Sequence, residues 1–144
     1  MHRGEQQYLQ LIKNIIKNGL IEKGRNGNTL SIVGTNMRFS LKNNKIPFTT
    51  TKRLAWKPCL KELLWFIKGD TNNENLQTQN VKIWNDNASR EFLDSRGLYN
   101  LDENDLGPVY GHQWRFYNAK YSNCYEDYSN KGVDQLQNVI DGIK

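Results

Sequence analysis

The carboxyl group of Glu62 lies in a stretch of sequence whose pattern suits acid–base chemistry. On a helix, the four positions three and four residues away from Glu62 are all apolar: Pro58, Cys59, Trp65 and Phe66. Apolar surroundings raise the pKa of a carboxyl group, which suits a group that exchanges a proton near neutral pH. Glu62 is therefore a candidate catalytic residue. The alternative is a partly exposed glutamate whose aliphatic stem lies over Trp65.

Two other stretches combine aromatic rings with hydrogen-bonding side chains. Trp84 precedes three polar residues, which is typical of a pocket rim, although a loop anchored by one tryptophan is the commoner arrangement. In GPVYGHQWR (107–115), glycines on both sides of Tyr110 allow the backbone to approach a ligand closely, or to form a tight turn in the core. His112 is of the type that acts as a general base, but no local Ser or Cys pairs with it, so we assign it no role.

The elements that must position these residues include both helices and strands. Apolar residues at helical spacing predict helices over 5–18, 58–68, 89–95 and from 133 onward. Ser89 is the predicted N-cap of the third helix, and Leu60, Leu63, Leu64 and Ile67 are the predicted buried stripe of the second. The glycine- and asparagine-rich residues 24–28 predict a loop, and alternating apolar residues over 30–41 predict one bent strand or two. No repeat or linker divides the chain.

Composition and length narrow the class of protein. The chain has 144 residues, of which 37% are apolar and 11% aromatic, as in soluble globular proteins and unlike disordered or collagen-like chains. No apolar run approaches the ~18–20 residues of a membrane span, and the polar N-terminus does not resemble a signal peptide. We therefore expect a cytoplasmic protein. Cys59 and Cys124 form neither a metal-ligand pattern nor a disulfide framework, so we expect no metal.

Charge is distributed unequally along the chain. Residues 1–68 carry thirteen Lys and Arg against three acids, whereas residues 69–144 carry seven against twelve. The basic half predicts an anionic ligand such as a phosphate or a polycarboxylate, or else lysines that only solvate exposed faces. No basic tract is longer than Lys52-Arg53, and this does not favour a nucleic acid partner.

Seven sequence motifs, in the same order along the chain as in a known family, show a resemblance to that family: TLSIVG (29–34), TTKR (50–53), ELLWFIKGDT (62–71), VKIW (81–84), ASREFLDSRG (88–97), DLGPVYGHQWRFYNAKY (105–121) and DYSNKGVDQLQNVI (127–140). Together they resemble the N-terminal half of thymidylate synthase. The resemblance implies an α/β fold, with helices packed on a mixed sheet that forms a homodimer interface. Residues 1–144 would be the N-terminal part of that single domain, incomplete at the C-terminus.

The resemblance also implies a reaction and the residues that serve it. The family methylates dUMP to dTMP and uses 5,10-methylenetetrahydrofolate as co-substrate, without a metal. Glu62 matches the catalytic glutamate, and Tyr110 matches a tyrosine in the hydrogen-bond network at the reacting pyrimidine carbon. Trp84 and Asn87 match residues beside the folate, and Ile83 matches an apolar wall there; the resemblance makes Trp84 a candidate catalytic residue as well.

Two basic residues match the family's contacts to anionic groups. Arg25 matches the arginine that holds the dUMP phosphate, and Lys52 matches a residue near the glutamate tail of the folate. The loop of Arg25 departs from the family pattern, because GRNGNTLS stands here for the usual DRTGTGTLS and is one residue shorter. Ala55 and the pair Asn85-Asp86 also replace other residue types.

The family's nucleophile, a cysteine in a Pro-Cys-His motif, has no counterpart in this sequence. Pro58-Cys59 is followed by leucine, and Cys124 lies in the polar stretch SNCYED. The last helix also runs to Lys144 without a stop signal, so we expect a piece of a larger domain that is inactive alone. Two other hypotheses remain: a non-catalytic module that binds a nucleotide or a partner, and a fragment of a pyrimidine-nucleotide hydroxymethylase.

Overall fold

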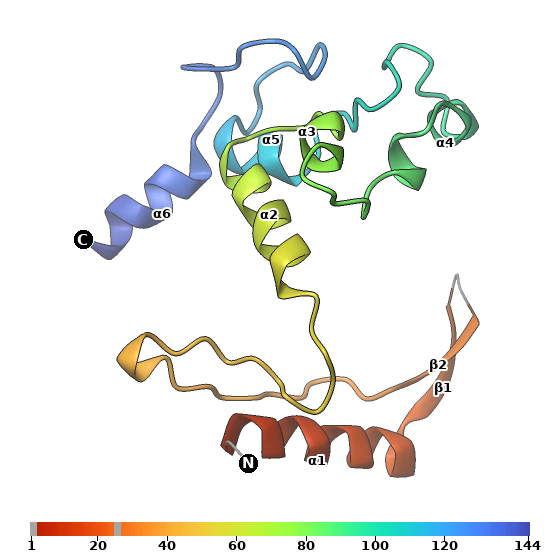
Figure 1. Cartoon of the computed structure of the whole chain (residues 1–144), viewed down its shortest axis with the longest axis vertical. Coiled ribbons are helices and arrows are strands. Elements are labelled where there is room, and N and C mark those ends of the chain that lie inside the picture. Colours follow the sequence, from red (N-terminus) through yellow and green to blue (C-terminus); the bar gives the residue numbers. More distant parts are fainter. Residues whose placement is uncertain (1–2, 25–26) are drawn as a thin grey trace. The chain divides into compact units, whose positions relative to one another are not determined.

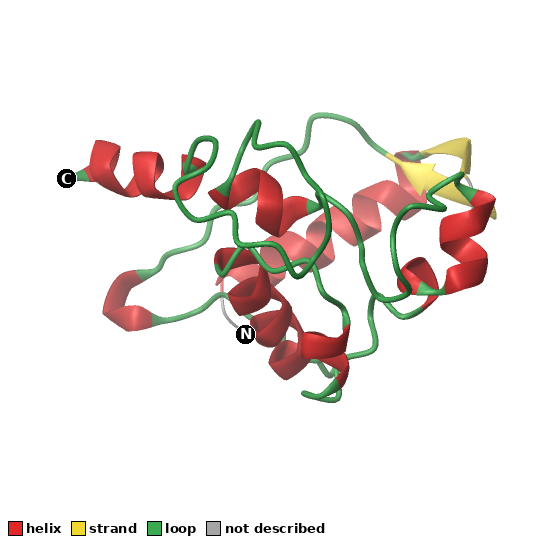
Figure 2. Cartoon of the chain, turned by 90° about the horizontal axis from the view of Figure 1, so that it is seen from above, coloured by secondary structure: helices red, strands yellow, loops and turns green. Residues whose placement is uncertain are grey.

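The chain forms two compact units, Met1–Leu54 and Ala55–Lys144, in a computed structural model that describes residues 3–24 and 27–144 (Figure 1). Figure 2 shows several helices, long loops and one small sheet. The predicted α/β class is confirmed. Within the described ranges the sheet is a two-stranded antiparallel hairpin. Those ranges contain no helix with the length and apolar character needed to cross a membrane.

Helix α1 (Arg3–Asn18) opens the first unit and ends where the sequence predicts. The backbone N–H of Gly19 donates to the carbonyl of Ile15 at 2.8 Å. A Cβ atom on Gly19 would lie 2.5 Å from that same oxygen, so the close approach requires glycine.

Strands β1 (Leu20–Gly24) and β2 (Gly27–Ser31) follow, with Leu20 paired to Ser31 and Gly24 paired to Gly27. Of the residues predicted as a loop over 24–28, residues 24, 27 and 28 lie in these strands, and residues 25–26 lie outside the described residues. The predicted strand over 30–41 ends at Ser31, and residues 32–41 form no strand in the described structure. A strand needs a neighbouring backbone to hydrogen-bond with, and the alternating pattern does not supply one. The short helix η1 (Lys42–Asn44) comes next.

Glu5 anchors the end of this unit from within α1. Glu5 is 5% exposed, and its carboxyl group accepts hydrogen bonds from the hydroxyl and the backbone N–H of Thr50, and from the N–H of Thr51 at 2.7 Å. The side-chain bond from Thr50, followed by its backbone bond, lowers the pKa of Glu5. These bonds fix the backbone immediately before Lys52.

The second unit is helical. It contains α2 (Trp56–Ile67), α3 (Glu74–Gln77), η2 (Asp86–Ala88), α4 (Arg90–Ser95), α5 (Tyr110–Arg115) and α6 (Gln135–Ile143). Helix α2 packs against α3 and α5, and α5 packs against α6. The buried core of the unit comprises Trp65, Leu76, Val81, Ala88 and Leu106.

The apolar stripe predicted for α2 does not face this core. Leu60, Leu63 and Leu64 are 44–49% exposed, whereas Trp65 is 2% exposed. The helix is apolar on two sides, so periodicity detects the helix without deciding which side faces inward. The prediction of the helix is confirmed, and the prediction of its buried residues is wrong for these leucines.

Side-chain caps begin two of the helices. Ser89 accepts a hydrogen bond from the N–H of Phe92 at 3.2 Å, which confirms it as the N-cap of α4. Asp134 accepts from the N–H of Gln137 at 2.9 Å and caps α6. Each bond satisfies one backbone donor that has no partner within its helix.

Candidate active site

Glu62 and Trp84 are joined by a hydrogen bond. The indole Nε1 of Trp84 donates to Oε1 of Glu62 at 2.7 Å, across 22 positions of sequence. Both side chains are partly exposed. The bond holds the carboxyl group of Glu62 by one oxygen and leaves the second oxygen to act on a proton, as a general acid or base requires.

Trp84 also belongs to an aromatic cluster that is centred on Phe66, one helical turn after Glu62. The ring of Phe66 lies 5.2–6.3 Å, centroid to centroid, from four other rings: those of Trp65, Trp84, Tyr110 and Trp114. The Trp84 and Tyr110 rings are also 6.1 Å apart. The fold therefore brings three predicted site residues, Glu62, Trp84 and Tyr110, into one place.

The segment that carries Ile83, Trp84 and Asn87 ends in a tight turn that is held at Ala88. The backbone N–H of Ala88 donates to the carbonyl of Trp84 at 3.0 Å, and the carbonyl of Ala88 accepts from the N–H of Asn104 at 2.9 Å. Ile83 is 51% exposed and Asn87 is partly exposed. The turn thus presents an apolar side chain and a carboxamide on either side of Trp84 in sequence.

Backbone geometry places Tyr110 at the first position of α5. Gly107 has a φ of +71°, a conformation that favours glycine. A Cβ on Gly111 would lie 2.7 Å from the carbonyl oxygen of Asp70, so α5 approaches the segment after α2 very closely. The sharp path predicted for this stretch is confirmed. His112 is 1% exposed and packs among other rings, so it belongs to the core.

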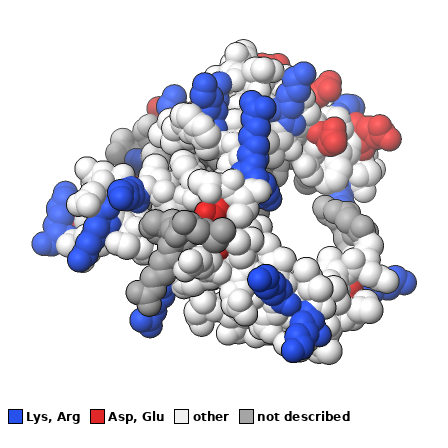
Figure 3. All heavy atoms as spheres, turned by 60° about the horizontal axis from the view of Figure 1, so that its bottom comes forward, with Lys and Arg blue, Asp and Glu red and all other residues white. Residues whose placement is uncertain are grey.

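The two basic residues predicted for the site, Arg25 and Lys52, belong to the first unit, Met1–Leu54. Lys52 is exposed and directly follows the threonines bound to Glu5. Arg25 lies outside the described residues. On the face drawn in Figure 3, Lys and Arg side chains stand singly or in small groups and form no continuous patch. Across the described ranges, no group of three or more His, Cys, Asp or Glu side chains could hold a metal ion.

Three rings of the cluster belong to residues that the sequence analysis does not assign to the site: Trp65, Phe66 and Trp114. Trp65 and Phe66 appear there only as apolar neighbours of Glu62. Trp114 lies four positions after Tyr110, and side chains four positions apart share one face of a helix, so this spacing is the signal that could have found it.

The thiol of Cys124 is poorly suited to act as a nucleophile near neutral pH, because its pKa is raised. Burial, followed by the charge of Asp105, raises its pKa to about 11. Because the thiolate is the reactive form, we expect alkylation of Cys124 by iodoacetamide to be slow near neutral pH and to rise about tenfold per pH unit toward the pKa. Peptide mapping of a Cys59→Ser variant, which lacks the exposed thiol, measures the rate. A rate independent of pH over this range would contradict the assignment.

Comparison with known proteins shows which family has a sequence like that of this chain. The thymidylate synthase family model matches residues 6–144. The chain belongs to the thymidylate synthase family. It is 53% identical to the thymidylate synthase of Homo sapiens over 98% of this chain and 45% of the human protein. It is 50% identical to the thymidylate synthase of Ascaris suum over 100% of this chain and 49% of that protein.

A third relative has a second activity in its name. The chain is 49% identical to the bifunctional dihydrofolate reductase-thymidylate synthase of Leishmania amazonensis, over 97% of this chain and 27% of that protein. The chain thus spans between about a quarter and a half of the length of these relatives. Thymidylate synthases are methyltransferases that use methylenetetrahydrofolate as co-substrate.

Proposed function

We propose that this chain forms the N-terminal part of a thymidylate synthase, which methylates dUMP to dTMP with 5,10-methylenetetrahydrofolate as co-substrate. The observation that carries the proposal is the 2.7 Å hydrogen bond from Trp84 to Glu62 beside the ring of Tyr110. Family membership supports the choice of reaction. In this proposal both compact units belong to one domain, which acts in the cytoplasm as a homodimer.

Glu62 serves as the proton-transfer group of the proposed reaction. The indole N–H of Trp84 fixes one of its oxygens, and the second exchanges a proton with a water molecule at the pyrimidine ring. The surrounding rings lower the local dielectric, which strengthens the interaction of this carboxyl group with developing charge. Tyr110 supplies a hydroxyl to the same hydrogen-bond network.

The folate lies against the exposed apolar surface next to this pair. Ile83 is 51% exposed and Tyr110 is 55% exposed, so together with Trp84 they offer area on which a flat heterocycle can stack. The carboxamide of Asn87 provides hydrogen-bonding groups nearby in sequence. Lys52 attracts the carboxylates of the glutamate tail, and Arg25 holds the phosphate of dUMP.

The covalent step requires a thiolate that adds to the pyrimidine ring. The raised pKa of Cys124 argues against that residue, and Cys59 is not followed by histidine. We therefore assign the nucleophile to the part of the family domain that lies outside these 144 residues. The same part covers the exposed leucines of α2 and the apolar side chains of α6, among them Ile143 at 81% exposure.

The proposal is tested by completing the domain. We define the completed enzyme as this chain followed by the C-terminal half of the human relative. The expected result is dTMP formation from dUMP and methylenetetrahydrofolate by the completed enzyme, and none by the 144-residue chain alone. The product is measured by chromatography, and dihydrofolate formation is followed by absorbance.

Two outcomes would replace the proposal. A folded completed enzyme without turnover, combined with dUMP binding to the 144-residue chain alone, would favour a non-catalytic binding module. Unchanged turnover after replacement of the Pro-Cys-His cysteine in the appended half by serine would show that the proposed nucleophile is wrong.

A further inference from the structure

A fully buried carboxyl group, that of Asp105, lies in the loop before α5. It is 0% exposed. Its Oδ1 accepts hydrogen bonds from the hydroxyl of Tyr121 at 2.6 Å and from the backbone N–H of Gly107 at 2.8 Å. Its Oδ2 accepts from the N–H of Cys124 at 2.9 Å. A buried carboxyl group is tolerated only when such donors replace water, so these three bonds hold it in a single position.

The hydrogen bonds of Asp105 and Tyr121 connect three separate segments. The Tyr121 hydroxyl also lies 2.8 Å from Oγ1 of Thr71, which follows α2. The backbone N–H of Leu106 donates to the carbonyl of Thr71 at 3.2 Å. The end of α2, the loop before α5 and the loop after α5 therefore meet at one buried point.

This point determines where α5 begins. Gly107, bound to Asp105, turns the chain with its positive φ, and its carbonyl accepts from the N–H of Val109 at 2.7 Å. Tyr110 is the next residue and the first of α5. The position of its ring relative to α2, and hence to Glu62, follows from how this loop is held against Thr71.

We propose that Asp105 and Tyr121 form a positioning pair that places Tyr110 against Glu62 and Trp84. The inference rests on the proposed function, in which these three residues act at the pyrimidine and the folate. Reacting groups held to within a fraction of an ångström gain much of their rate from geometry, and a displacement of about 1 Å can cost about 10²-fold. Burial, together with the bond to Asp105, raises the pKa of Tyr121, so its hydroxyl keeps the proton that it donates.

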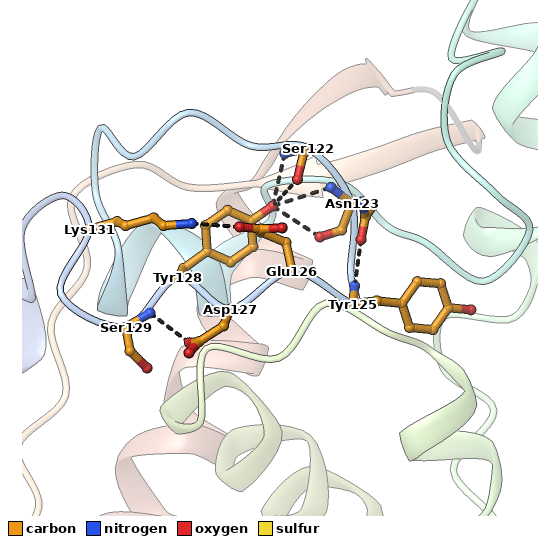
Figure 4. Close-up of polar contacts among 8 residues, drawn as sticks. All are labelled: Ser122, Asn123, Tyr125, Glu126, Asp127, Tyr128, Ser129 and Lys131. Carbon is orange, nitrogen blue, oxygen red and sulfur yellow. Dashed lines mark hydrogen bonds and ion pairs between the residues drawn. The ribbon is translucent and has the colours of Figure 1, made fainter.

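Tyr128 offers a matched control for Tyr121. The two rings stack with centroids 5.5 Å apart, and the Tyr128 hydroxyl is also hydrogen-bonded. Its hydroxyl accepts from the N–H groups of Ser122 and Asn123 at 2.8 and 3.2 Å and donates to the carbonyl of Asn123 at 2.9 Å (Figure 4). These partners all lie in the turn after Tyr121, so Tyr128 does not bind the loop that leads to Tyr110.

The test compares Tyr121→Phe with Tyr128→Phe in the completed enzyme. Each change removes one hydrogen-bonded phenol hydroxyl and keeps the ring, so the two variants differ in which segments lose a hydrogen bond. We expect only Tyr121→Phe to move the ¹⁵N–¹H signal of the Trp84 indole, identified by its absence in Trp84→Phe. We also expect only Tyr121→Phe to lower kcat, by about tenfold or more, with little change in KM for dUMP.

Asp105→Asn keeps the shape of the side chain and gives a second measurement. Because it acts on the same contact, its effect on kcat should not add to that of Tyr121→Phe in the double variant. Equal effects of Tyr121→Phe and Tyr128→Phe on the indole signal would overturn the positioning role. A parent enzyme without turnover would contradict the proposed function instead, and the indole signal would still decide whether the pair positions the cluster.

Discussion

Glu62→Gln in the completed enzyme is expected to lower kcat by roughly 10²–10⁴, the range that general acid–base groups contribute. Glutamine keeps the side-chain shape and a carbonyl oxygen that can accept the hydrogen bond from Trp84 Nε1. The change therefore removes the exchangeable proton of the carboxyl group and preserves its place in the aromatic cluster. Steady-state kinetics should show KM for dUMP changing far less than kcat, because a proton-transfer group acts mainly in the transition state.

Glu91→Gln provides the control for this measurement. Glu91 is an exposed residue in the first turn of α4, so its replacement makes the same chemical change away from the cluster. It should leave both kcat and KM at the values of the parent. Equal losses in dUMP binding and turnover for Glu62→Gln would instead indicate that Glu62 holds the cluster together and transfers no proton.

Arg25→Ala is expected to weaken dUMP binding by roughly ten- to a hundredfold, because a charge-assisted, bidentate contact contributes about 1.5–3 kcal/mol. Binding of deoxyuridine, which has no phosphate, should stay unchanged. Arg25→Lys should restore only part of the affinity, since lysine keeps the charge and loses the planar fork. Calorimetric titration of both ligands against the completed enzyme measures these differences.

Lys23→Ala separates this contact from a general effect of charge. Lys23 is exposed on β1, two positions before Arg25, and its removal lowers the net charge by the same amount. It should change dUMP affinity much less than Arg25→Ala. If Arg25→Ala and the parent bind dUMP equally well, the shortened loop does not carry the arginine to the phosphate.

Local elements were predictable where the chain itself encodes their limits. Gly19 ends α1, and the hydroxyl of Ser89 caps α4, as the sequence indicates. Residues 32–41 show the opposite case, because their alternation indicates a strand but the backbone partner must come from elsewhere. The inward side of α2 was likewise not predictable, since that helix is apolar on two sides and the core contacts choose between them.

The sequence indicated three residues that the fold brings together, Glu62, Trp84 and Tyr110, but it did not indicate their contacts. The apolar neighbours of Glu62 follow from helical spacing, and family resemblance adds Trp84 and Tyr110. The hydrogen bond between Glu62 and Trp84 joins residues 22 positions apart in the sequence. A local sequence pattern does not predict a contact over that distance. The proposed role of Asp105 was also not predictable, because an aspartate two positions before a glycine looks like an ordinary turn residue until its burial is known.

The positions of the four tryptophans have an optical consequence. Trp65, Trp84 and Trp114 all lie around Phe66, while Trp56 stands apart at the start of α2 with 46% of its surface exposed. Three of the four indoles that emit in this chain therefore lie in the aromatic cluster, and their emission depends on what lies against the cluster. A heterocycle that stacks on Trp84 would quench or shift this emission directly, so occupancy of the cluster can be followed without a label.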